Sequence, residues 1–319
     1  MKNMKTAAGM LCLAGILSLG MGTTVFAEDG DSHYPVTITT YNYENEPVEM
    51  TFEKAPEKVF AYANSNIEEL LALGLGDKIV AAYGLDGDVR EDLKDEFDKI
   101  QYMDTKPSKE EVVAMEPDFI AAWYSSFDDD WLSDVSFWQE RDVNTYMSLN
   151  SAAKGPASEF PRTIEDEYED ILNLGKIFDC EDKAEEIVDQ MKGEIDKVKE
   201  HVEGTDPLSV AVLEDEGDSF RVYGTETLGG NIPETLGAEL KLGAENSENV
   251  GAEDLIAADP DVLFMINYDG FMTADEAIAD ITDNPAYASL SAVKNNKVFS
   301  VNLNEVYCSG VRTYDGIMT

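Results

Sequence analysis

Two loops rich in aromatic side chains could hold a ligand by ring stacking. Trp123, Tyr124 and Phe127 come at the end of one apolar run, and Tyr268 and Phe271 follow another. We expect both runs to be strands of open α/β sheets, which bind ligands beyond the carboxyl ends of their strands. Buried aromatic residues more often belong to the core, but core residues normally lie within strands and helices. We therefore predict ligand contact for these five residues. By the same reasoning, weaker candidates are Trp131, Tyr223 and Tyr307.

Arginine is scarce, with five residues in a chain whose formal net charge is −43. An arginine directed into a cleft would hold an anionic ligand against this unfavourable field. Arg162 lies in a loop that enters a helical region, and Arg312 lies in a late loop. We predict that these two contact the ligand, whereas Arg90 and Arg141 are interpreted as surface residues.

The histidine content excludes one class of binding site. The chain has only two histidines, His33 and His201, and a receptor for bare zinc or manganese ions needs several in its cleft. We assign no metal-ligating residue and no cofactor, so any metal should arrive inside a chelator. The sequence also lacks a nucleophile elbow, a P-loop and a Cys/His cluster, which argues against an enzyme.

A repeated pattern indicates the elements that would position these residues. Glu110 lies seven residues before Pro117, and Glu253 lies seven residues before Pro260; each proline precedes an aspartate and an apolar run. Proline ends a helix, and an apolar run without alternation is typical of a buried parallel strand. The two copies predict two similar α/β lobes that face each other across a ligand-binding cleft.

The order of these patterns divides the chain. Residues 36–161 form the expected N-terminal lobe, residues 162–204 a bridging helical region and residues 205–319 the C-terminal lobe. No Gly/Ser-rich or Pro-rich linker separates the lobes, so we expect a helix that begins near Thr163 to join them. Residues 28–35 are polar and expected to be disordered.

The first 27 residues are typical of a secretory signal peptide. Lys2 and Lys5 precede an apolar run over residues 7–22, and small residues lie near Ala27. Export is therefore expected. Cys12 lies early in the apolar run and not at its end. This position favours free secretion over lipid anchoring, although both alternatives stay open. The later cysteines, Cys180 and Cys308, are interpreted as unpaired thiols, with a disulfide as the alternative.

Composition limits the partners. The 319 residues are 43% hydrophobic, enough for two folded lobes, and the strong negative charge excludes nucleic acid as a natural partner. Most acidic residues are expected on solvated faces.

Several segments in order resemble the ferric-siderophore and vitamin B12 substrate-binding proteins of ABC importers. The resemblance implies two Rossmann-like lobes bridged by a single long helix, the class III fold. Members of that family continue with a C-terminal helix after the last matching segment, and this sequence ends at Thr319, so we expect either that this helix is missing or that the sequence is a fragment. The segments are 55–59, 69–80, 107–110, 117–118, 171–178, 290–298 and 310–313.

The resemblance also implies a function and a partner. In this family, matching acidic residues on the two lobes dock onto arginines of the membrane permease, and Glu110 and Glu253 occupy matching positions. A lone glutamate at a helix start would otherwise only complement the helix dipole. We expect a monomeric extracytoplasmic receptor that delivers an iron–siderophore complex to an ABC importer.

Alternatives remain open at this point. The ligand could be a corrinoid such as vitamin B12, or haem with a tyrosine as axial ligand. An uncharged aromatic cleft would favour a corrinoid or a hydroxamate, and cleft arginines would favour a catecholate or carboxylate chelate. A sensor that signals without transport, or an enzyme, is less favoured.

Overall fold

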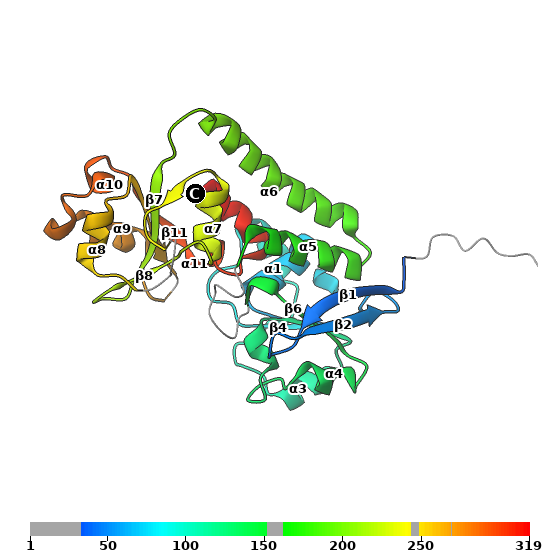
Figure 1. Ribbon diagram of the computed structural model, residues 1–319. Helices are drawn as coiled ribbons and strands as arrows, with labels where there is room; N and C mark the ends of the chain where they lie inside the picture. Colours follow the sequence, from blue (N-terminus) through cyan, green and yellow to red (C-terminus); the bar gives the residue numbers. More distant parts are fainter. Residues whose placement is uncertain (1–32, 152–161, 244–248, 269) are drawn as a thin grey trace, which may run out of the picture. The chain divides into compact units, whose positions relative to one another are not determined.

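The structure is a computed structural model that describes residues 33–151, 162–243, 249–268 and 270–319 (Figure 1). The predicted signal peptide lies outside these residues. The expected disorder of residues 28–35 is wrong for residues 33–35, because the Tyr34 hydroxyl donates a hydrogen bond of 2.8 Å to the Ile177 carbonyl. None of the helices in the described ranges is long and apolar enough to cross a bilayer.

The first lobe is built on a parallel sheet of four strands in the order β4-β3-β5-β6. An antiparallel hairpin, β1–β2, lies beside β6. The strands are β1 Val36–Tyr41, β2 Pro47–Phe52, β3 Val59–Tyr62, β4 Ile79–Tyr83, β5 Phe119–Ala122 and β6 Asn144–Met147. The helices are α1 Asn64–Ala72, α2 Lys94–Phe97, α3 Lys109–Ala114 and α4 Val135–Gln139.

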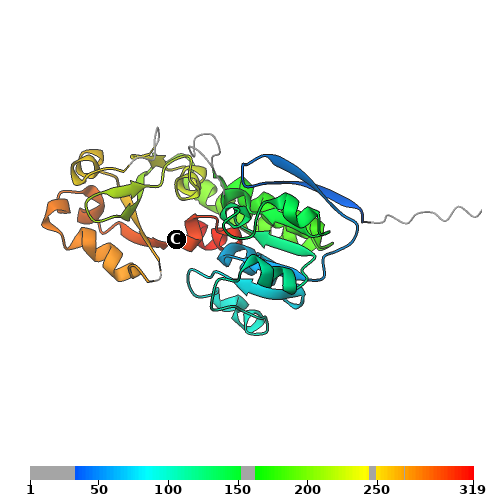
Figure 2. The same cartoon turned by 90° about the horizontal axis from the view of Figure 1, so that it is seen from below.

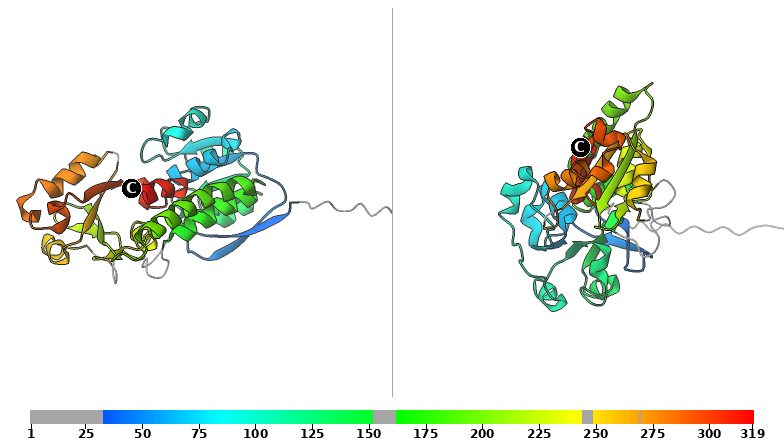
Figure 3. Two further views of the ribbon diagram at one scale, coloured as in Figure 1. Left: turned by 90° about the horizontal axis from the view of Figure 1, so that it is seen from above. Right: turned by 90° about the vertical axis from the view of Figure 1, so that its left-hand side faces the viewer.

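Two helices occupy the region that links the lobes, α5 (Ile164–Ile177) and α6 (Glu181–Val202). They lie side by side (Figure 3), and a Cβ placed at Gly175 would come within 2.5 Å of the Ala184 Cβ, so only glycine permits this packing. The helix that begins near Thr163 therefore stops at Ile177, and α6 alone leads into the second lobe. Its buried face shows helical spacing: Ala184, Val188, Met191 and Ile195.

The second lobe has a mixed sheet in the order β11-β10-β7-β8, with β9 also paired to β7. β10 is parallel to β7 and β11, and β8 is antiparallel to β7. The strands are β7 Ser209–Asp215, β8 Phe220–Val222, β9 Glu239–Leu240, β10 Val262–Asn267 and β11 Val298–Asn302. The helices are α7 Leu228–Thr235, α8 Ala252–Ala258, α9 Ala274–Thr282, α10 Ser291–Lys294, α11 Leu303–Val306 and α12 Thr313–Met318.

The repeated sequence pattern has the predicted structure in both lobes. The helix α3 precedes β5, and α8 precedes β10. Each aspartate after the proline joins two strands: Asp118 accepts the Lys58 amide at 2.8 Å just before β3, and Asp261 accepts the Ser209 amide at 3.0 Å at the start of β7. The Pro-Asp pair thus both ends a helix and fixes a neighbouring strand.

The C-terminal segment returns to the first lobe and the connecting helices. The short helix η6 (Gly310–Arg312) packs against α1 and α5, and α12 packs against α6 and α7. Figure 2 shows this segment in red beside the first lobe. It contributes Val311 and Ile317 to the core that also contains the first-lobe sheet.

Candidate ligand-binding site

Four aromatic side chains gather at the carboxyl ends of the first-lobe strands: Tyr62, Tyr83, Trp123 and Trp131, here called the first-lobe aromatic group. Tyr62 is the last residue of β3, Tyr83 is the last residue of β4, and Trp123 follows β5. The Tyr62 ring centroid lies 4.7 Å from that of Trp131, 6.0 Å from Tyr83 and 6.1 Å from Trp123. Sequence reasoning missed the two tyrosines, although each is the last residue of a strand whose carboxyl end lies at the site.

Hydrogen bonds hold the two indoles of this group in place. The Trp123 Nε1–H donates to the Ser65 Oγ at 2.9 Å, and the Trp131 Nε1–H donates to the Pro107 carbonyl at 2.7 Å. Burial raises the pKa of Tyr62 to about 12, so its phenol stays protonated at neutral pH. Trp131 is buried, whereas Tyr62, Tyr83 and Trp123 are partly exposed, so these three can offer neutral, oriented rings to a ligand.

The second lobe places tyrosines around one carboxylate. Glu214, near the end of β7, accepts a hydrogen bond of 2.9 Å from the Tyr223 hydroxyl, and the Arg221 guanidinium lies 3.6 Å from it. Tyr268 follows β10, and its pKa is raised by burial and by Glu214. The Tyr268 ring stacks on the 52% exposed Phe271 at 4.9 Å.

Tyr307, which follows the second-lobe sheet, contacts the first-lobe aromatic group. Its ring centroid lies 6.1 Å from Trp123, and the Arg162 guanidinium lies 5.9 Å from its face. Burial raises the pKa of Tyr307, and the positive charges of Arg162 and Arg221 oppose that rise. The Arg162 Nε–H donates to the Asn150 carbonyl at 3.1 Å. One guanidinium group, that of Arg162, therefore lies over the ring of Tyr307, and that of Arg221 lies over the ring of Tyr223 at 5.2 Å.

Three residues predicted to contact a ligand are buried or paired within the protein. Arg312 forms an ion pair with the buried Glu68, with Nε 2.6 Å from Oε2, so its guanidinium is committed within the protein. Phe127 is 1% exposed and belongs to the core, because the short helix after β5 turns its ring inward. Tyr223 is equally buried, with its hydroxyl bonded to Glu214. Arg90, interpreted as a surface residue, donates to the Val311 carbonyl and pairs with Asp92.

Tyr124 was predicted to contact a ligand, and Arg141 was predicted to lie on the surface. Tyr124 is partly buried and stacks on Tyr43 at 5.8 Å beside the first-lobe aromatic group. Arg141 is exposed, as expected, with its guanidinium 3.6 Å above the Phe137 ring. Cys180 and Cys308 are free thiols.

A hollow lies at the opposite end of the second-lobe strands. Its volume is about 500 Å³, and its lining is mostly apolar, with Val210 and Val262 from the amino-terminal ends of β7 and β10. Ligands of open α/β sheets bind beyond the carboxyl ends instead. We therefore place the candidate site at the aromatic rings.

Glu110 and Glu253 occupy equivalent places in the two lobes. Both are exposed and lie in the first turn of their helices, α3 and α8. Those helices run towards the amino ends of β5 and β10, so their first turns lie on the side of the carboxyl ends. The Pro107 carbonyl, three residues before Glu110, accepts the hydrogen bond from Trp131.

Comparison with known proteins places this architecture in a family. A model of the family described as periplasmic binding protein matches residues 59–302, which include both sheets. The chain belongs to the periplasmic binding protein family. This is a family of substrate-binding transport proteins and not of enzymes.

Relatives of the periplasmic binding protein family cover most of the chain. A crystal structure of a periplasmic binding protein from Veillonella parvula is 32% identical, with a TM-score of 0.83 and coverage of 90% of each chain. The Bacillus subtilis ABC transporter substrate-binding lipoprotein YvrC is 24% identical over 98% of this chain and 96% of that protein. The Fe(3+)-citrate-binding protein YfmC of the same organism is 25% identical over 62% of this chain and 58% of that protein.

Proposed function

We propose that this protein captures an iron–siderophore complex outside the cytoplasm and delivers it to the permease of an ABC importer. The observation that carries the proposal is the set of aromatic residues at the carboxyl ends of the strands in both lobes, with Tyr307 of the second lobe in contact with Trp123 of the first. Family membership and the ferric-citrate-binding relative support iron chelates as the cargo.

The guanidinium groups favour an anionic chelate. Arg162 and Arg221 flank Tyr307 and Tyr223, and the Lys106 ammonium lies 4.2 Å from the Trp131 ring centroid. In a chain of net charge −43, positive groups beside the rings attract an anion that the rest of the surface repels. A carboxylate or catecholate complex of iron fits these groups better than a neutral hydroxamate complex or a corrinoid.

We assign the docking of the protein onto the permease to the two exposed glutamates. Glu110 and Glu253 belong to repeated helix–strand units, one in each lobe, so a single membrane partner could contact both. Carboxylates in this arrangement would pair with permease arginines, and such charge pairs set the register of a complex. Export to the outer face of the cytoplasmic membrane follows from the same role.

The experiment is a fluorescence titration of the purified protein. Trp123 and Trp131 lie in the proposed site, so a bound ferric chelate should quench their emission. The panel contains ferric citrate, a ferric catecholate, a ferric hydroxamate, haem and cobalamin, with the iron-free chelators as controls. Saturable quenching by a ferric chelate supports the proposal. Binding of only cobalamin or haem would replace it with the corrinoid or haem alternative, and no binding of any compound would contradict it.

A further inference from the structure

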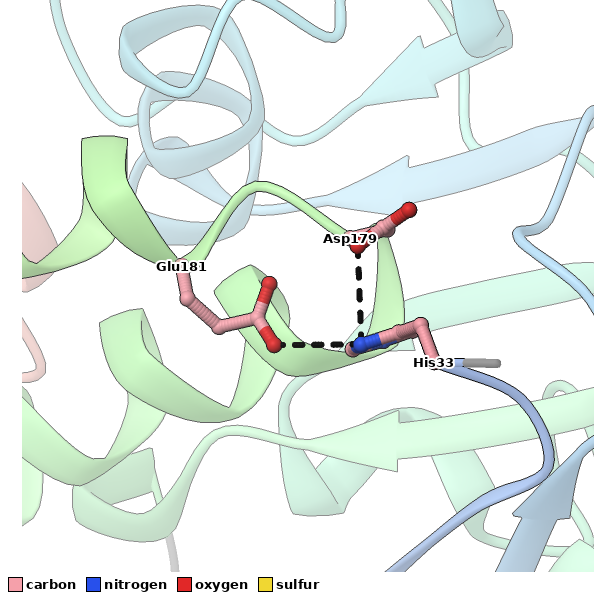
Figure 4. A group of neighbouring side chains, drawn as sticks. All are labelled: His33, Asp179 and Glu181. Carbon is pink, nitrogen blue, oxygen red and sulfur yellow. Dashed lines mark ion pairs between the residues drawn. The ribbon is translucent and has the colours of Figure 1, made fainter. Parts of the chain in front are cut away.

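His33 lies against the turn between α5 and α6 and faces two carboxylates. Its Nδ1 atom is 3.2 Å from the Glu181 Oε1 and 3.5 Å from the Asp179 Oδ1. Its other ring nitrogen, Nε2, lies 2.7 Å from the Lys176 carbonyl oxygen. Figure 4 shows the ring edge directed at both carboxylates. The three side chains thus converge from two segments far apart in the sequence.

The contact with Lys176 determines which ring nitrogen carries a proton. A carbonyl oxygen only accepts hydrogen bonds, so the His33 Nε2 must donate one. In that tautomer a neutral ring directs its Nδ1 lone pair at two carboxylates, which is repulsive. A cation therefore belongs between the three groups: a second proton on Nδ1 or a metal ion. A histidine that binds metal through one nitrogen typically donates its other N–H to a carbonyl or carboxylate.

The two distances from Nδ1 are compatible with a metal ion. A charge-assisted N–H···O contact between a protonated ring and a carboxylate is about 2.7–2.9 Å long. Tetrahedral zinc, with ligand bonds of about 2.0–2.2 Å, separates its nitrogen and oxygen ligands by about 3.4 Å. The separations of 3.2 and 3.5 Å lie on either side of the tetrahedral value and exceed that of a charge-assisted hydrogen bond.

We propose that His33, Asp179 and Glu181 bind one divalent cation of the zinc type, with water completing the tetrahedron. Their ligand atoms all lie within 4.8 Å of one another. An imidazole with two carboxylates suits zinc, whereas calcium and magnesium prefer oxygen ligands alone. This site is separate from the proposed chelate site and does not depend on the proposed function.

The site would fasten the chain just before β1 to the turn that precedes the connecting helix. The Tyr34 hydroxyl already bonds to the Ile177 carbonyl in the same turn. A metal ion at His33 would add a second, stronger attachment, because metal bonds present only in the folded protein add their binding free energy to its stability.

The test is calorimetry of tag-free protein with zinc chloride in chelator-free buffer. We expect one zinc ion per chain and a higher unfolding temperature with zinc. His33→Ala should weaken binding at least about tenfold and abolish the thermal shift. His201→Ala is the matched control, since His201 is the other histidine and is exposed in the last turn of α6. X-ray absorption of the zinc-loaded protein should show one imidazole nitrogen bound to the metal.

Milder variants keep the test valid if His33→Ala unfolds. Glu181→Gln and Asp179→Asn preserve side-chain shape and should each weaken zinc binding while the protein stays folded. The proposal is overturned if the wild type binds no zinc at millimolar concentration, which would leave only an ion pair. It is also overturned if His33→Ala binds as tightly as the wild type, or if calcium and magnesium compete equally with zinc.

Discussion

Arg312 and Glu68 form a two-point ion pair that joins the end of the chain to the first lobe. The Arg312 Nε is 2.6 Å from one carboxylate oxygen of Glu68, and Nη2 is 2.7 Å from the other. Glu68 lies in α1 and is fully buried, and its carboxylate also accepts the Arg90 amide at 2.8 Å. The pair thus fixes η6, which follows the second-lobe sheet, against the first lobe.

Replacement of Arg312 by alanine should lower the free energy of unfolding by about 3–5 kcal/mol, because it leaves a buried carboxylate without its partner. Urea denaturation measures this change. Arg141→Ala, at an exposed arginine, should cost much less. A loss below about 1 kcal/mol in Arg312→Ala would mean that Glu68 is neutral or solvated.

The buried Glu167 should make stability depend on pH. Burial raises the pKa of this carboxyl to about 7, although it accepts hydrogen bonds from Asn150, Ser309 and Gly310. Burial also raises the pKa values of the neighbouring Glu69 and Asp170. Between pH 4.5 and 7 the folded state therefore holds more protons than the unfolded state.

The free energy of unfolding should consequently fall as the pH rises from about 4.5 to 7, by on the order of 3 kcal/mol from Glu167 alone. Glu167→Gln should reduce this dependence, because glutamine does not titrate, while Glu69 and Asp170 maintain the rest of the slope. Glu165→Gln removes the same charge from an exposed position of α5 and should preserve the slope. Equal slopes in Glu167→Gln and the wild type would refute the raised pKa.

The aromatic rings should contribute more to binding than to folding. Trp123→Ala and Tyr268→Ala should each weaken chelate binding about tenfold or more, since contact residues at the centre of a site carry much of the affinity. Calorimetry gives the affinity, and thermal unfolding corrects for stability. Phe299→Ala is the control, because that ring is 42% exposed on β11 and outside the proposed site. Normal binding by both variants would show that the site has been misplaced.

The arginines should discriminate between ligand classes. Arg162→Gln and Arg221→Gln should each weaken binding of ferric citrate by about tenfold and change binding of a neutral ferric hydroxamate little, because a charge-assisted contact to an anion is worth about 1.5–3 kcal/mol. Parallel titrations with both chelates measure the ratio. Arg141→Gln should leave both affinities unchanged. Equal losses for both chelates would argue that the arginines act through shape alone.

Substitutions at Glu110 and Glu253 should reduce transport without reducing chelate affinity. Lysine at either position should leave chelate affinity intact, since both residues are exposed in α3 and α8. Transport in vesicles that carry the cognate importer should fall, because attraction to a permease arginine becomes repulsion. The double variant should transport least, and Asp254→Lys, one residue further along α8, is the control. Full transport by the double variant would leave these acids as simple helix-start charges.

The local sequence determined the framework because its signals act over short distances. Proline after a short helix, followed by aspartate and an apolar run, was enough to predict the units α3–β5 and α8–β10 in both lobes. The same rule placed Trp123 and Tyr268 beyond the ends of strands. Helix starts were equally local, as in the capping box between Ser108 and Glu111.

Tertiary structure decided which side chains face each other, because pairing depends on contacts between distant segments. Nothing near Arg312 in the sequence indicates that it pairs with Glu68, more than two hundred residues away. Tyr62 and Tyr83 contact Trp131 because the parallel strands β3 and β4 end at the same edge of the sheet. His33 likewise met Asp179 and Glu181 only because the segment before β1 packs against the α5–α6 turn. Local propensity fixes where an element begins and ends, whereas the packing of the cores fixes what its surface residues touch.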